Sequence, residues 1–142
     1  MENSNQIPKW IKYYTIFFVV LGFNAAAIGY FMPGMMFMNV KVDFAEITTI
    51  TGMFGARNLT FGVMAIMALY FKDPKYYFVL FVARFVTELQ DMVVLTTTNA
   101  MPVPAILVVV SWLLFFLAPE YLAIKWLWNQ INLTSAKDSS KL

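Results

Sequence analysis

Four charged residues lie inside long apolar stretches of this 142-residue sequence, a setting in which ionisable groups are rare. Arg57 interrupts one of these stretches, and another contains Arg84, Glu88 and Asp91. The last three follow one another at intervals of four and three residues, so on a helix they form a stripe along one face. Because each such group costs on the order of 3 kcal/mol at the centre of a membrane helix, the stripe predicts partners and a role in binding or proton transfer.

The rest of the composition limits the chemistry open to this stripe. The chain has no cysteine and no histidine, which excludes disulfides, thiol redox chemistry, imidazole or thiolate metal sites and histidine-assisted nucleophiles. The net charge is only +2, and the basic residues are spread along the chain, so no nucleic-acid surface is expected. We therefore expect neither a metal nor a cofactor.

Four apolar segments must position the charged residues. Hydrophobic residues make up 61% of the chain and charged residues 13%, against roughly a quarter charged in soluble domains. The segments lack period-two alternation and suit membrane helices of about 20 residues, which predicts an all-α, polytopic four-transmembrane-helix bundle. We expect one domain over residues 1–128, a polar tail over residues 129–142, and spans at residues 13–32, 47–71, 76–98 and 105–128 with a kink near Pro119.

The basic residues predict the orientation of this bundle. Those expected on the cytoplasmic side are Lys9, Lys12, Lys72, Lys75, Lys125, Lys137 and Lys141. Only Lys41 lies in the loop between the first two segments, so the positive-inside rule places both termini in the cytoplasm, as an even number of spans requires. A cleaved signal peptide is an alternative for the first segment, but apolar residues continue to Phe37, which favours an uncleaved span.

The second segment has two different faces. Small residues lie on one face and predict close approach of another helix: Thr48, Thr51, Gly52, Gly55 and Gly62. Arg57 lies on the other face, roughly 21 Å from the cytoplasmic end at about 1.5 Å per residue, level with Glu88 and Asp91 at roughly 18 and 22 Å. Two arginines and two carboxylates sum to zero charge, so we expect Arg57 to pair with Asp91 or Glu88.

These observations predict a ligand pocket between the second and third helices, with an apolar wall and a charged floor. The candidate ligand-binding residues are Phe54, Arg57, Asn58, Phe61, Phe81, Arg84, Glu88 and Asp91. A purely structural alternative stays open, in which the charges only fix helix register. We interpret Met35, Met36 and Met38 as packing residues rather than a copper site, and Glu120, close to Lys125, as a solvated residue at the cytoplasmic interface.

The segment Gly55–Gly62, which contains Arg57, Asn58 and Leu59, resembles the Gly-x-Arg-Asn-Leu-x-x-Gly pattern of DoxX-like small bacterial membrane proteins. Asp91 is similar to the acidic position that such proteins carry in their third helix. The resemblance implies a four-helix protein of the bacterial inner membrane. Some members are described as partners of membrane oxidoreductases or as assembly helpers, although the absence of cysteine argues against a thiol-linked role here.

The leading functional hypothesis is a non-catalytic binding or accessory protein that holds an apolar small molecule or lipid, of quinone or isoprenoid type. One alternative is a membrane isomerase or cyclase with Glu88 or Asp91 as the general acid. Another is a small proton-coupled carrier in which the carboxylates titrate. The expected partners are the lipid bilayer, the apolar ligand and either a membrane protein or a second copy of the chain.

Overall fold

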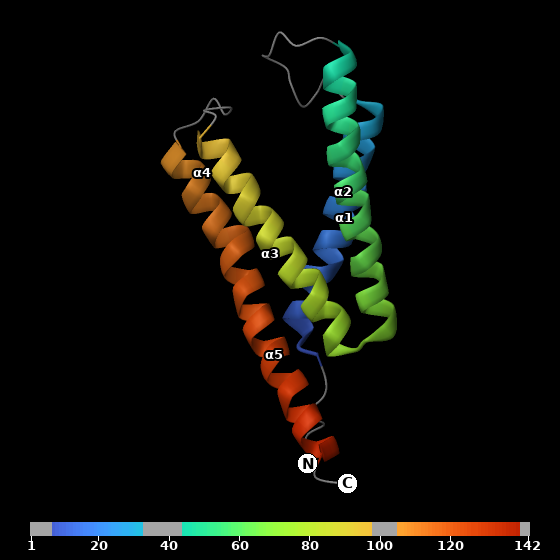
Figure 1. Cartoon of the computed structure of the whole chain (residues 1–142), viewed down its shortest axis with the longest axis vertical. Coiled ribbons are helices and arrows are strands. Elements are labelled where there is room, and N and C mark those ends of the chain that lie inside the picture. The colour runs from blue at the N-terminus through green and yellow to red at the C-terminus, as the bar shows by residue number, and fades with distance from the viewer. Residues whose placement is uncertain (1–6, 33–43, 98–104, 140–142) are drawn as a thin grey trace. The chain divides into compact units, whose positions relative to one another are not determined.

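The structure, a computed structural model, describes residues 7–32, 44–97 and 105–139, and these ranges contain helices and no strand (Figure 1). The helices are α1 (Lys9–Phe31), α2 (Phe44–Phe71), α3 (Pro74–Thr97), α4 (Ala105–Trp112) and α5 (Ala118–Ser139). A π-helical segment, η2 (Leu113–Leu117), joins α4 to α5 without a break, so these three form one continuous rod. The prediction of an all-α fold is confirmed.

Three helical stretches are long and apolar enough to cross a membrane, namely Lys9–Phe31, Thr48–Phe71 and Val109–Ala136. This finding indicates a membrane protein. α3 has 24 residues and therefore the length of a span, but it contains three charged residues, Arg84, Glu88 and Asp91, and is not among these three stretches. A fourth span stays a prediction.

Polar side chains on the apolar helices bond to their own backbone. The Asn24 amide donates to the carbonyl oxygen of Val20 at 2.7 Å, and the Thr60 hydroxyl donates to that of Ala56 at 2.9 Å. Both bonds lie on exposed parts of their helices. Because a bilayer offers no water to exposed polar groups, such internal bonds suit helices that face lipid.

The chain divides into two compact units, and the first consists of Ile7–Lys72. In this unit α1 and α2 run side by side in opposite directions (Figure 1). Gly22 lies so close to α2 that an added Cβ would be 2.7 Å from the carbonyl oxygen of Asn58 and 3.0 Å from Cα of Gly62. One heptad further on, a Cβ at Gly29 would be 2.6 Å from the carbonyl oxygen of Thr51. Small residues therefore bring the two backbones into direct contact.

The predicted small-residue face of α2 is confirmed in part. Thr51, Gly55 and Gly62 are buried, and the two glycines contact α1. Gly52 was wrongly assigned to this face, because a Cβ there would meet nothing within 4 Å, and Thr48 is exposed. The correct face follows intervals of four and three residues, which places Gly52 one residue, or about 100°, away from Thr51.

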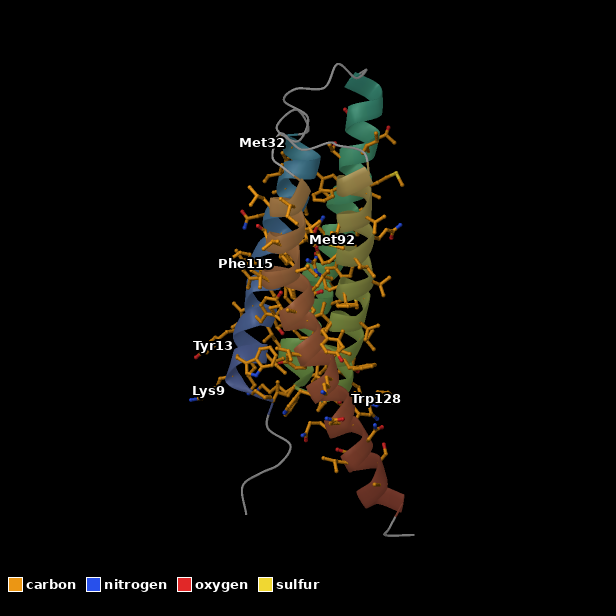
Figure 2. All side chains as sticks on the ribbon, turned by 90° about the vertical axis from the view of Figure 1, so that its left-hand side faces the viewer. Lys9, Tyr13, Met32, Met92, Phe115 and Trp128 are labelled. Atoms are coloured by element: carbon orange, nitrogen blue, oxygen red, sulfur yellow. The ribbon has the colours of Figure 1, made fainter. Side chains whose placement is uncertain are left out.

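The second unit contains α3 and the rod formed by α4, η2 and α5. The rings of Phe78 and Trp128 lie 5.6 Å apart, and Arg84 lies opposite Glu120, so α3 and α5 are antiparallel. Figure 2 labels Phe115 and Trp128 along the rod. α5 continues past Trp128 to Ser139, so residues 129–139 of the predicted polar tail are helical.

Candidate functional site

A buried ion pair lies in the middle of α3. Nη2 of Arg84 donates a hydrogen bond to Oε1 of Glu88, one turn later on the same helix. The two side chains are only 5% and 6% exposed, so each group neutralises the other where solvent does not reach. The predicted stripe is thus confirmed for Arg84 and Glu88, whereas Asp91 is only half-buried.

A second carboxylate meets this pair from α5. Oε1 of Glu120 lies 3.7 Å from Nε of Arg84, and the Glu120 side chain is completely buried. Neither of its carboxylate oxygens has a hydrogen-bond partner among the residues that the structure describes. The prediction of a solvated Glu120 at the interface was therefore wrong. Helix α5 extends well beyond this residue, and its buried face carries Glu120 toward α3.

The packing faces of α3 and α5 position the three charged groups. Both helices bury residues at intervals of three and four, as packed helices do. The buried residues of α3 are Tyr77, Leu80, Phe81, Arg84 and Glu88, and those of α5 together with η2 are Leu117, Glu120, Ala123 and Leu127. Most members of both sets are apolar, so the charged cluster is packed among apolar side chains of the two helices.

The π-helical segment η2 lies directly before Ala118 and Pro119, the two residues that precede Glu120. Pro119 has no N–H group, so an α-helical bond to the carbonyl oxygen of Phe115 cannot form. The N–H of Ala118 instead bonds to the carbonyl oxygen of Leu113, five residues back. One extra residue in a turn rotates the rest of the helix by about 100° relative to an uninterrupted α-helix, and such segments are frequent at functional sites. The structure thus has a π-helical turn at the kink predicted near Pro119.

Two more polar atoms of the same unit are buried without a hydrogen-bond partner in the described part of the chain. They are the hydroxyl oxygen of Tyr77 and Nε1 of Trp112. Buried polar groups in proteins are nearly always satisfied, so each unsatisfied group marks a place where a ligand or an ordered water could bind.

The other predicted ligand-binding residues belong to the first unit. The guanidinium of Arg57 lies 5.3 Å from the centre of the Phe54 ring, a cation–π contact. Asn58 is buried near the contact with α1 and donates to the carbonyl oxygen of Phe54 at 2.9 Å. Phe61 is also buried. Since α2 and α3 lie in different units, the pocket between them and the pairing of Arg57 with Asp91 or Glu88 stay predictions.

Glu120 is the residue that reasoning from the sequence missed. Together with Lys125 of the same predicted span, it brings the charged residues of the apolar segments to three cations and three carboxylates, namely Arg57, Arg84 and Lys125 against Glu88, Asp91 and Glu120. The available signal was that apolar residues predominate on both sides of Glu120, from Ala105 to Ala118 and from Tyr121 to Trp128, with Lys125 as the one charged residue in the second stretch.

Comparison with known protein families, with curated proteins and with solved structures found no match for this chain. The resemblance to the DoxX-like group, drawn from the Gly55–Gly62 pattern and Asp91, therefore stays a prediction.

Proposed function

We propose that this chain is a small integral membrane protein that binds an apolar molecule with one polar end, of quinone or isoprenoid type, without catalysing a reaction. The buried cluster of Arg84, Glu88 and Glu120 carries the proposal, because a fully buried carboxyl group without a hydrogen bond offers a place for the polar end of a ligand. The exposed apolar side chains of the helices suit the surrounding lipid.

The proposed protein crosses the bacterial inner membrane four times, with both termini in the cytoplasm, and resembles DoxX-like proteins in this layout. We expect Phe54 and Phe61 of α2 to contact the apolar body of the ligand, as the sequence predicts. The guanidinium of Arg57 serves as a further polar contact, and half-buried Asp91 serves as its ion-pair partner. A double-mutant cycle tests this pairing. A coupling of about 0.5 kcal/mol or more between Arg57→Leu and Asp91→Leu supports contact, and additive effects exclude it.

The central experiment is mass spectrometry of the small molecules that co-purify with the chain in mild detergent. We expect one apolar compound in amounts close to those of the protein. The variant Arg84→Leu with Glu88→Leu removes the ion pair and leaves the net charge unchanged, so it should fold and lose the compound.

Gln90→Leu is the matched control, because Gln90 lies on α3 between the charged residues and is exposed. This variant should retain the compound at the level of the unmodified protein. The same mixture of bulk membrane lipids in all three samples would contradict a specific binding function.

A further inference from the structure

We infer that Glu120 holds a proton and donates it in a hydrogen bond to a carbonyl oxygen of the bound molecule. The ligand is then a quinone-type carbonyl compound and not an isoprenoid hydrocarbon. The hydrogen bond to a ligand rests on the proposed function, whereas the protonation of Glu120 rests on the geometry of α3 and α5.

The surroundings of Glu120 favour the neutral acid. The side chain is 0% exposed, and its closest charged atom, Nε of Arg84, lies at 3.7 Å, beyond hydrogen-bond distance. Arg84 is already neutralised by Glu88 through its Nη2 group. An ionised carboxylate without hydrogen bonds costs far more in an apolar environment than a neutral hydroxyl group does. A proton on Glu120 removes that cost.

The titratable groups around Glu120 are few. η2 and α4 contribute none, since their sequences contain only apolar residues and Ser111. Within the described ranges, α3 is the other helix that supplies ionisable groups near Glu120. α5 itself adds two nearby ones, whereas its Lys137 and Asp138 lie about 25 Å or more further along the helix at about 1.5 Å per residue. These groups are Tyr77, Arg84, Glu88 and Asp91 on α3, and Tyr121 and Lys125 on α5. Arg84 is the sole cation on α3 within the apolar stretch, and it faces two glutamates.

The other buried glutamate of this unit differs from Glu120. Glu88 accepts a hydrogen bond from Arg84, whereas neither carboxylate oxygen of Glu120 has a hydrogen-bond partner among the described residues. The proton is therefore assigned to Glu120 and not to Glu88.

A protonated carboxyl group selects the chemistry of the ligand. Its O–H is a donor, and leaving a buried donor without an acceptor costs the full desolvation penalty. A quinone carbonyl supplies the acceptor in a molecule that is otherwise apolar. A hydrocarbon chain supplies none, so it would leave the O–H unsatisfied.

Infrared spectroscopy of the purified chain, with no probe added, tests the protonation. We expect the carbonyl stretch of a protonated carboxyl group at neutral pH, its loss in Glu120→Gln, and its retention in the control Lys125→Gln. The band should disappear as pH rises and Glu120 ionises. An unchanged band in Glu120→Gln would overturn the assignment. If that variant does not fold, glutamate labelled with carbon-13 in the unmodified chain must shift the band, and an unshifted band would equally overturn it.

Binding of two probes tests the ligand class. Decylbenzoquinone has carbonyl acceptors and decylbenzene has none, although both carry the same alkyl chain. Glu120→Leu removes one hydrogen bond, so it should weaken binding of the quinone about tenfold. Binding of decylbenzene should stay unchanged. Glu120→Gln retains an N–H donor and should bind the quinone independently of pH, whereas the unmodified protein should release it as pH rises.

The outcomes separate the two proposals. If neither probe binds but the infrared band belongs to Glu120, the binding function fails and the protonated glutamate stands. Equal binding of both probes, with or without Glu120, would overturn the inferred hydrogen bond while leaving an apolar binding protein.

Discussion

The contact between α1 and α2 makes a quantitative prediction about Gly22. Replacing it with alanine adds a Cβ 2.7 Å from the carbonyl oxygen of Asn58, well below the 3.4 Å at which ordinary contact begins. The atoms on the far side belong to backbone, including Cα and N of Gly62 at 3.0 Å, so no side chain can rotate away. The two helices must separate, which also loosens the neighbouring contact at Gly29.

The expected loss of stability is the balance of two opposing terms. Overpacking of a close contact costs about 1 to 3 kcal/mol. Alanine recovers about 0.5 to 1 kcal/mol through its higher helix propensity. Gly22→Ala should therefore lower the free energy of unfolding by about 1 to 2 kcal/mol, and Gly29→Ala, whose Cβ would lie 2.6 Å from a carbonyl oxygen, should do the same.

Gly52→Ala is the matched control on α2, because its Cβ would meet nothing within 4 Å. Only the propensity term applies, so this variant should be equal to the unmodified chain or more stable by up to about 1 kcal/mol. Reversible unfolding in mixed micelles with rising SDS, followed by circular dichroism, measures all three variants. Equal stability of Gly22→Ala and Gly52→Ala would refute the close approach of α1 to α2.

Two further predictions concern the ion pair and the topology. Arg84→Leu alone leaves Glu88 without its guanidinium and should cost about 3 to 5 kcal/mol of stability, and adding Glu88→Leu should recover part of this loss in the same unfolding assay. In this cysteine-free chain, Lys72→Cys should resist an impermeant thiol reagent added outside the cell, whereas Asn99→Cys should react; external labelling of Lys72→Cys would contradict the orientation.

Local signals in the sequence were sufficient for several features of the fold. The end of α2 at Phe71 was predicted from the polar residues and the proline just after it, and Asp73 indeed accepts a hydrogen bond from the N–H of Lys75 at 2.8 Å, beside Pro74. The face shared by Arg84 and Glu88 is also predictable from spacing alone, because both lie on the same helix.

Features that depend on a second helix were beyond such reasoning. The burial of Glu120 requires that α5 packs against α3 through this face, and the π-helical turn before Pro119 sets which face that is. Because Lys125 lies close to Glu120 in the sequence, we expected Glu120 at the cytoplasmic interface instead. Likewise, the glycines of α2 predicted a close contact but not its partner, since the matching small residues, Gly22 and Gly29, lie on a separate segment.

The arrangement of charges on α3 bears directly on whether this helix crosses the membrane. When each charged residue is counted separately, α3 is not among the described helical stretches that are apolar enough to cross a membrane. Arg84 and Glu88 nevertheless form one neutral, buried pair, which costs less in a bilayer than two separate charges. Apolar residues predominate on the exposed side of α3, with Val79, Val86 and Leu89 among them, although Gln90 is exposed as well. A helix that buries its ion pair and exposes mostly hydrocarbon is suited to lipid, and for this reason we propose α3 as the fourth span.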